Sequence, residues 1–555
     1  MAAPSSSDSA LRFFRFAEEY LKSSFEFMPP IASSLGLHDY DGRTPDLSKD
    51  AIARRVTEIK EALDELATID RAGLDTDTRL DYDLLRQGIS ADLFRYGEQH
   101  EHTYFPMLAM FLSDVTGYVK RDYAPADERV RKMIEYQRGV PRLIEQAQAL
   151  LEPPLAKPLL KTAIEMCNGQ ASYMQNNLPE TVTHQVSDQK LLAEFGEANR
   201  EVIDAIEGYI GFLKEQLEHA KEDFAIGAPM FERMLAVNEL VDLPIERVLE
   251  VGRANLEANK QAFIETARQI DPNKDVREVA EMVSVDHPTA EGLIADTSAM
   301  LEEIRQYLID KDLITVPSEV RCKVAETPEF LRWGFAFMDS PGPFETKATE
   351  AYYYVTPVEK SWTPEQAEEW LRRFNYGTLR AVSIHEAYPG HYVHFLHSAM
   401  VTSPIRKTFG SYSFVEGWAH YCEQMMIEEG YRGENPLLHF AQLGEALLRN
   451  CRYVVSIMMH TDRMTLDEAT RFMMENAFME ELPARKEATR GTFDPGYLNY
   501  TLGKLLLLKL REDVKAREGA NFTLKSFHDR VLALGYPPVP LVRRHLLGEG
   551  DGEIL

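Results

Sequence analysis

Cysteine is scarce in this chain, since its 555 residues include only four. They stand at positions 167, 322, 422 and 451, and no two of them form a Cys-x-x-Cys pair. Disulfide frameworks and cysteine-based zinc sites both draw on closely spaced cysteines. The sequence therefore argues against both, and it predicts a protein of a reducing compartment.

Positive charge and long apolar runs are also in short supply. The 61 Lys and Arg residues face 89 Asp and Glu residues, and the net charge of −28 argues against a general affinity for nucleic acid or anionic lipid. The most apolar stretch, 505–508, is far shorter than the roughly 18 residues that span a bilayer. The N-terminal residues lack a basic segment followed by an apolar one, so no secretory signal is expected. We expect a soluble, cytoplasmic protein with no nucleic-acid or membrane partner, and we leave its oligomeric state open.

Apolar residues recur at helical spacing along most of the chain. The clearest cases are residues 11–27, 52–66, 130–151 and 191–217. The best strand candidate is 351–356, a Tyr-rich run between Pro-Gly-Pro at 341–343 and Pro357. We therefore predict a mainly α protein with a minor β element. A helical N-terminal half, 1–320, would pack on a catalytic C-terminal half, 321–555, although no linker marks the boundary and both could form one globule around a cleft.

The chemistry is expected at a histidine-rich run, 385–391. A zinc hydrolase needs about three N or O ligands, an open position for water, and a base that deprotonates this water. The usual helical motif, His-Glu-x-x-His, sets two histidines four residues apart on one face. Here His385 and His391 are six residues apart, a net rotation of about 240° on an unbroken helix. On a regular helix the two rings would therefore diverge.

Two residues inside the run can correct this spacing. Pro389 has no N–H and clashes with the preceding turn, and Gly390 can adopt backbone angles that other residues avoid. We predict that both bulge out of the helix, which would restore the relation between the histidines and keep Glu386 beside the water that it deprotonates. The alternative is an ordinary surface or core cluster, because His394 and His397 follow closely.

A carboxylate or histidine on a neighbouring helix would complete the ligand set. Residues 411–429 are predicted to form that helix, with Gly430 as its C-cap. Glu416 is the expected ligand, and His420 and Glu423 on the same face would orient a ligand or contact substrate. The alternatives are a core histidine at 420 and a solvated helix face at 423.

These two motifs resemble those of the DUF885 family. The family carries His-Glu-x-x-Pro-Gly-His, matched here at 385–391, and Glu-Gly-Trp-Ala-x-Tyr-x-Glu, matched at 416–423. It is grouped with the gluzincin-type metallopeptidases, near the mostly helical folds of angiotensin-converting enzyme and the oligopeptidases, which have a deep cleft. Weaker resemblances lie at residues 35–41, 353–355, 449–460, 495–503 and 527–535.

The resemblance implies one Zn²⁺ ion held by His385, His391 and Glu416, with Glu386 as the general base. Four positions depart from the family pattern, and none of them removes a proposed ligand. They are Tyr392, His420, Ser456 and Tyr497, of which Ser456 and Tyr497 put substrate specificity in doubt.

The expected reaction is hydrolysis of peptide bonds by metal-activated water, with Glu386 passing the proton of the water to the leaving amine. The resemblance makes Tyr500 the candidate donor to the oxyanion, with His460 as a second one. Tyr497, Tyr500 and Lys504 share a helix face, so the alternative for Tyr500 is packing in the core.

Substrate binding is assigned to residues in or near the stretches that resemble the family. A peptide's terminal carboxylate would need a cation, and Arg452, Arg490 and Lys504 are the candidates. Tyr353 lies in the predicted strand, which could pair as an edge with an extended peptide. Tyr497 is the remaining substrate-binding candidate.

Other functions use parts of the same pattern. The substrate could be a short peptide, cleaved by a carboxypeptidase, dipeptidase or oligopeptidase, or a non-peptide amide. A non-haem iron oxygenase shares the set of two histidines and one carboxylate, but it needs no base beside the first histidine. A binding or scaffold protein with a structural metal would normally have four ligands, often cysteine, and no cysteine here pairs with the motif.

Overall fold

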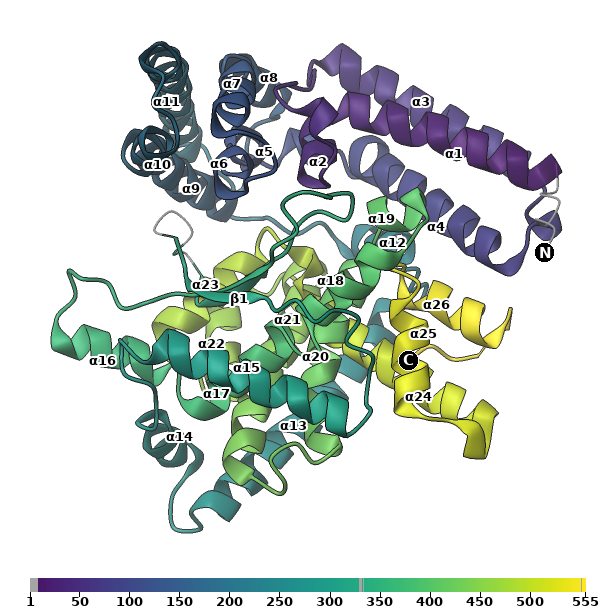
Figure 1. Ribbon diagram of the computed structural model, residues 1–555, viewed down its shortest axis with the longest axis vertical. Helices are drawn as coiled ribbons and strands as arrows, with labels where there is room; N and C mark the ends of the chain where they lie inside the picture. Colours follow the sequence, from purple (N-terminus) through teal and green to yellow (C-terminus); the bar gives the residue numbers. More distant parts are fainter. Residues whose placement is uncertain (1–7, 329–331, 333, 551) are drawn as a thin grey trace. The chain divides into compact units, whose positions relative to one another are not determined.

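The computed structural model describes residues 8–328, 332, 334–550 and 552–555. It is mostly helical with one small sheet, which confirms the predicted fold class (Figure 1). The chain forms two compact units, one from Met1–Phe224 with Pro341–Thr349 and the other from Ala225–Ser340 with Glu350–Leu555. The boundary expected at 320 falls inside the second unit, because the long helix 245–270 packs along the long helix 436–461.

The first unit consists of helices and their connections. Its helices are α1 (Asp8–Phe27), α2 (Pro29–Ser34), α3 (Lys49–Ala67), α4 (Thr76–Leu93), α5 (Leu108–Ser113), α6 (Gly117–Lys120), α7 (Ala126–Gln137), α8 (Val140–Leu150), α9 (Lys157–Gln175), α10 (Asn177–Gln185) and α11 (Gln189–Leu217). The predicted helices 11–27, 52–66 and 191–217 are confirmed as α1, α3 and α11. The segment 130–151 is divided into α7 and α8, because Pro141 cannot continue a helix and stands in the first turn of α8.

The second unit contains the sheet and the remaining helices. The helices before and after the sheet are α12 (Ala228–Asn238), α13 (Ile245–Ile270), α14 (Val276–Ser284), α15 (Leu293–Asp310), α16 (Pro364–Arg372), α17 (Tyr376–Glu386), α18 (His391–Met400) and α19 (Pro404–Thr408). The C-terminal helices are α20 (Tyr412–Glu428), α21 (Pro436–Thr461), α22 (Leu466–Asn476), α23 (Glu481–Gly491), α24 (Asn499–Glu518), α25 (Leu524–Leu532) and α26 (Val539–Leu547). The predicted helix 411–429 is confirmed as α20, with Ser411 as its N-cap.

The sheet has the strand order β1-β3-β2, from β1 (Lys323–Glu326), β2 (Ala336–Asp339) and β3 (Tyr352–Val355). The predicted strand is confirmed as β3, but the expectation that it is an edge is wrong, because β1 pairs with it on one side and β2 on the other. The backbone N–H of Thr356 donates to the carbonyl of Phe335. In an antiparallel pair, alternate residues of a strand direct their N–H and C=O groups toward the partner strand and away from it. The backbone groups of Phe335 point to β3, so those of Ala336 and Met338 point to the outer edge of β2.

Helices α20 and α24 cross closely in the second unit. A Cβ added to Gly503 would lie 1.7 Å from the carbonyl oxygen of Ser413, and one on Gly417 would lie 2.5 Å from the Cα of Gly503. Real Cβ atoms cannot approach that closely, so glycine is required on both helices. The crossing brings the first turns of α20 and α24 together.

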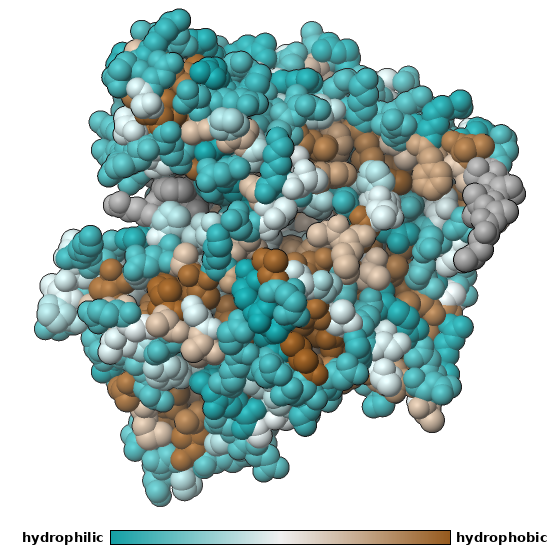
Figure 2. All heavy atoms as spheres, in the orientation of Figure 1, coloured by the Kyte–Doolittle hydropathy of each residue, from teal (hydrophilic) through white to brown (hydrophobic). Residues whose placement is uncertain are grey.

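The surface agrees with the charged composition. Figure 2 shows a face that is mostly hydrophilic, with apolar side chains in separate patches. Within the described residues, no helix is both long and apolar enough to cross a membrane. All four cysteines are buried free thiols.

Candidate metal centre

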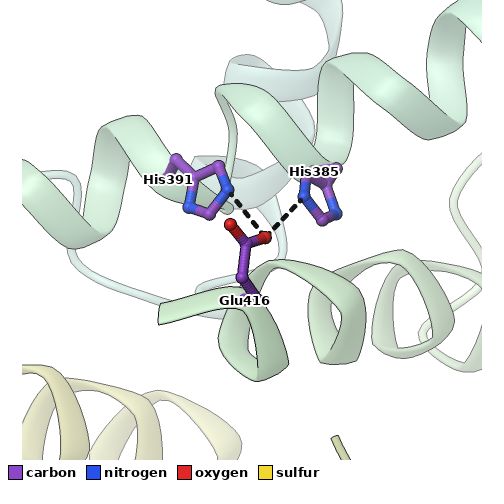
Figure 3. Close-up of side chains that lie close together, drawn as sticks. All are labelled: His385, His391 and Glu416. Carbon is purple, nitrogen blue, oxygen red and sulfur yellow. Dashed lines mark ion pairs between the residues drawn. The ribbon is translucent and has the colours of Figure 1, made fainter. Parts of the chain in front are cut away.

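The structure brings the three predicted ligands together. His385 is the next-to-last residue of α17, His391 is the first residue of α18, and Glu416 lies one turn into α20. Oε2 of Glu416 is 3.4 Å from Nε2 of each histidine, and both rings point at this carboxylate (Figure 3). The candidate ligand atoms all lie within 4.8 Å of one another.

These side chains fit a zinc ion in chemistry and in spacing. Two imidazole nitrogens and one carboxylate oxygen form a typical catalytic zinc set. Ligand atoms about 2.1 Å from a tetrahedral ion lie about 3.4 Å from one another, which is the spacing of Glu416 from both histidines. Oε2 of Glu416 is buried and has no hydrogen-bond partner among the described residues. Its nearest nitrogens are at the long limit of hydrogen bonding, so the oxygen is placed for a cation.

A turn between two helices, and not a bulge within one helix, brings His385 and His391 together. Helix α17 ends at Glu386, and α18 begins at His391 after the connection 387–390, in which the Tyr388–Pro389 peptide bond is cis. A Cβ on Gly390 would lie 1.8 Å from the carbonyl oxygen of His385, so the close return of the chain requires glycine. The bulge prediction is therefore corrected, because each histidine belongs to its own helix.

A tryptophan from the second motif supports this turn. Nε1 of Trp418 donates a hydrogen bond of 3.0 Å to the carbonyl of Pro389. Trp418 is fully buried on α20, two residues after Glu416. One helix therefore supplies a candidate ligand and also holds the connection between the other two.

The two further histidines of the run lie outside the ligand set. Nε2 of His394 bonds the carbonyl of Gly535, and Nε2 of His397 bonds the carbonyl of Thr315. Burial lowers the pKa of His394 to about 3, so its ring is neutral at ordinary pH. Both are core histidines. The alternative interpretation, a core cluster, therefore holds for these two residues of the run.

A buried carboxylate orients the first histidine. Oε1 of Glu423 is 2.7 Å from Nδ1 of His385 and 3.3 Å from Nη2 of Arg449, while Oε2 is 3.3 Å from Nδ1 of His420. A carboxylate on Nδ1 directs Nε2 of the ring toward the metal position. The solvated-face alternative for Glu423 is excluded, because the residue is 1% exposed. His420 is a core histidine, and burial with the nearby charge of Lys504 lowers its pKa to about 3.

The local charges favour a cation at the site. Burial and the charge of Arg449 lower the pKa of His385, but Glu416 and Glu423 outweigh them and raise it to about 9. Burial alone would raise the pKa of Glu416, yet His391 and His385 hold it well below its usual value. The carboxylates therefore stabilise positive charge between these side chains.

The candidate base lies at the end of α17 beside the sheet. Oε2 of Glu386 accepts a hydrogen bond of 2.9 Å from the backbone N–H of Met338 on β2. Since the N–H of Met338 points to the outer edge of β2, this edge lies against the end of α17. Tyr353 was expected to bind substrate, but it is fully buried, and its hydroxyl contacts Ser383 of α17 at 3.4 Å. Tyr353 therefore packs β3 against α17.

Tyr500 stands next to the candidate ligands. Its ring is stacked on that of His385 with centroids 6.4 Å apart, and three guanidinium groups lie within 6 Å of its ring. Burial and the charge of Glu416 raise the pKa of Tyr500. The phenol therefore keeps its proton at neutral pH and can donate a hydrogen bond.

The predicted carboxylate-binding cations are held by other groups to different extents. Arg452 forms a bidentate pair with Glu487 at 2.8 and 2.9 Å. Arg490 bonds Asp494 and the hydroxyl of Tyr412, and its side chain is 32% exposed. Lys504 is fully buried and thus inaccessible to a substrate. Arg490 alone of these three keeps substantial exposure.

Two further predicted residues lie in the core. Tyr497 is fully buried, against Gly491, and so cannot reach a substrate as the structure stands. Nε2 of His460 bonds the carbonyl of Gly491 at 2.8 Å, and burial lowers the pKa of His460 to about 4. His460 follows Arg449 by eleven residues on α21, about 16 Å along the axis. The structure does not bring His460 to the ligand set.

Some groups at the site were not singled out from the sequence. The guanidinium of Arg449 reaches Glu423 and His385, and the N–H of Met338 reaches Glu386. An arginine on an apolar helix is a usable signal for a buried ion pair. A backbone N–H carries no sequence signal, since its position depends on the sheet.

The chain matches one protein family in sequence and known structures in fold. The chain matches the family described as "Bacterial protein of unknown function (DUF885)" over residues 29–546. A solved structure described as a lipoprotein of unknown function from Shewanella oneidensis is 23% identical, with a TM-score of 0.82 over 96% of this chain and 99% of the other. A lipoprotein structure from Colwellia psychrerythraea is 18% identical, with a TM-score of 0.82 over 97% and 98%. No curated protein matches the chain.

The prediction of a cytoplasmic location is contradicted by these structures, because both neighbours are described as lipoproteins. The prediction was based on separate cysteines and on the lack of a long apolar run. Neither feature distinguishes the compartments in which a folded domain of this kind can reside.

Proposed function

The chain belongs to the DUF885 family, and we propose that it is a zinc-dependent peptidase acting on short peptides. The observation that carries the proposal is the spacing of His385, His391 and Glu416, with Oε2 of Glu416 3.4 Å from both imidazoles. Glu386 follows the first histidine directly, which favours hydrolysis over the other chemistries of such a ligand set. The relation to gluzincin peptidases belongs to this proposal.

A bound Zn²⁺ would supply Lewis acidity that polarises the scissile carbonyl and acidifies water. Glu386 takes a proton from the attacking water and gives it to the leaving amine. In the structure, the N–H of Met338 holds one oxygen of this carboxylate at 2.9 Å. The hydrogen bond fixes the carboxylate while its second oxygen can serve as the base.

Tyr500 donates its phenolic hydrogen to the developing oxyanion. Its stacking on His385 and its raised pKa support this role, since the donor must be close and protonated. The charges of Arg452 and Arg490 lower the pKa of Tyr500 in part, so they favour partial negative charge at its hydroxyl as it donates.

The substrate backbone would pair with β2. Its outer edge carries the polar groups of Ala336 and the carbonyl of Met338, and it lies beside Glu386. Arg490, which is 32% exposed, is the candidate for a terminal carboxylate. This combination favours extended short peptides as the substrate class.

A peptide-library digest analysed by mass spectrometry tests the proposal. The wild type should cleave peptides in a chelator-sensitive manner and equally well without oxygen, whereas an oxygenase would need oxygen. Glu386→Gln should keep about one zinc per chain while turnover falls by about 10²- to 10⁴-fold, because only the base is lost. His391→Ala should lose the metal.

A matched control is Glu369→Gln, which removes an exposed carboxylate from α16 in the same unit. It should retain wild-type turnover and zinc content. Full turnover by Glu386→Gln would remove this residue from the mechanism. Full zinc retention by His391→Ala would reject the ligand set.

A further inference from the structure

Glu239 is a buried carboxylate outside the ligand set. It follows α12 directly as the C-cap, and it is 2% exposed. Its two oxygens accept hydrogen bonds from two different helices. The hydroxyls of Ser411 and Ser413 and the N–H of Ser413 bond Oε2, the last two at 2.5 and 3.3 Å. The side-chain amide of Asn499 donates to Oε1 at 3.1 Å.

These donors stand at two helix N-termini. Ser411 is the N-cap of α20, and Asn499 is the first residue of α24. Unpaired N–H groups and the helix dipole make this end of a helix favourable for an anion. Burial raises the pKa of Glu239, although the hydrogen bonds from Ser411 and Ser413 lower it in part. Four hydrogen bonds therefore join Glu239 to the starts of α20 and α24.

The link adds an attachment at the N-terminal ends of two helices that pack along their length. Their closest approach is the crossing of Gly417 with Gly503, and on one side of it Arg511 of α24 bonds Glu428 of α20 at 2.8 Å. On the other side, the carboxylate of Glu239 joins Ser413 to Asn499 and so holds the first turns of both helices.

Two functional side chains lie between these attachments. Glu416 stands between Ser413 and Gly417 on α20, and Tyr500 stands between Asn499 and Gly503 on α24. A displacement of either first turn would move the ligand and the donor relative to each other. A misplacement of about 1 Å can cost about 10²-fold in rate.

We propose that Glu239 is a positioning residue that sets where Glu416 lies relative to Tyr500 by tying α20 to α24. The role rests on the proposed function for Tyr500, but its effect on Glu416 depends only on metal binding. Among the described residues, the hydrogen bonds of Glu239 go to Ser411, Ser413 and Asn499 and not to the candidate ligands, so it acts through the two helices.

The test uses Glu239→Gln and Asn499→Ala in the full chain. Glu239→Gln keeps the shape of the side chain and replaces one acceptor oxygen by a donor amide, and Asn499→Ala removes only the arm to α24. Zinc affinity, measured by competition with a chelator, should fall about tenfold or more, as for other groups that orient ligands. The visible spectrum of the cobalt-substituted protein should shift, kcat should fall about tenfold or more, and KM should stay within about twofold. The double variant should lose no more zinc affinity and kcat than Glu239→Gln alone, because the two substitutions break the same link.

The control is Asp529→Asn in the same unit. Asp529 also joins two segments, accepting from the N–H and hydroxyl of Thr315 at 2.8 and 2.7 Å and from Lys525 at 2.8 Å. It should lose stability but keep wild-type zinc affinity, cobalt spectrum and kcat. Equal losses of zinc affinity in Asp529→Asn and Glu239→Gln would overturn the positioning role, as would wild-type affinity and kcat in a folded Glu239→Gln. If Glu239→Gln fails to fold, the zinc affinity and kcat of Asn499→Ala test the positioning role in its place.

Hydrogen exchange separates this proposal from the proposed function. In metal-free protein, the amides of residues 411–416 and 499–503 should exchange faster together in Asn499→Ala, and should not in Asp529→Asn. Unchanged exchange in both segments would reject the link. Failure of the wild type to cleave peptides would reject the peptidase function and leave the zinc, cobalt and exchange results to decide the role of Glu239.

Discussion

Replacing Glu423 by Gln should damage both the stability of the metal-free protein and its affinity for zinc. Glu423 is 1% exposed and lies 3.3 Å from the guanidinium of Arg449. At an effective dielectric constant of about 20, unit charges at that distance attract by about 5 kcal/mol. Loss of one partner from a buried ion pair typically costs about 3–5 kcal/mol. Because Gln still accepts a hydrogen bond, we expect a loss of about 3 kcal/mol.

The effect on the metal has a separate cause. Glu423 bonds Nδ1 of His385 at 2.7 Å and so keeps Nε2 directed at Glu416. Changes in such partners typically weaken metal binding by about 10- to 100-fold. The charge is present at pH 7, because Arg449 and His420 hold the pKa of Glu423 well below its usual value although burial alone would raise it.

The assay is urea denaturation of the metal-free protein together with a zinc competition titration. Glu445→Gln is the matched control, because Glu445 bonds the same arginine at 2.9 Å but is 24% exposed. It should cost under about 1 kcal/mol and leave zinc affinity unchanged. Zinc binding by Glu423→Gln within twofold of the wild type would show that the carboxylate does not orient His385.

Two further changes test the packing and the charges elsewhere. Gly503→Ala should destabilise the protein by about 1–3 kcal/mol or more in thermal unfolding, because its Cβ would meet the carbonyl of Ser413 at 1.7 Å. Gly444→Ala on α21, with its nearest atom at 3.8 Å, should be neutral or stabilising, and equal tolerance at both positions would contradict the crossing. In the first unit, burial lowers the pKa of His38, but Asp41 at 3.1 Å and Glu345 at 2.8 Å raise it overall, beside the stacked ring of Tyr123. Protonated His38 therefore stabilises the fold below about pH 6.5, and this contribution is lost as pH rises through the raised pKa. The stability gap between wild type and His38→Gln in urea should shrink from about pH 5 to about pH 9, and a constant gap would refute the pairing.

The sequence predicts those features that depend on local pattern. Helical periodicity identifies α1, α3, α11 and α20, and the short Tyr-rich run identifies β3. The three candidate ligands also follow from two short motifs, because nearby residues on a helix keep fixed relations. The structure brings His385, His391 and Glu416 together as those motifs suggest.

Features that depend on packing between distant segments could not be predicted. The central place of β3 depends on strands that bear weak sequence signals. Tyr353 and Tyr497 carry side chains suited to substrate binding, yet both are buried by other elements. Arg452 looks available in the sequence, but Glu487, 35 residues away, occupies it.

The run 385–391 shows why its six-residue spacing matters. In a single helix, two histidine ligands would be placed by helix geometry alone. Here His385, His391 and Glu416 come from α17, α18 and α20, and contacts such as that of Trp418 with Pro389 bring these helices together. Zinc would then bind the packed state and not an isolated segment, so its binding energy adds to the stability of the fold. The Pro-Gly turn thus makes metal affinity depend on the packing of three helices.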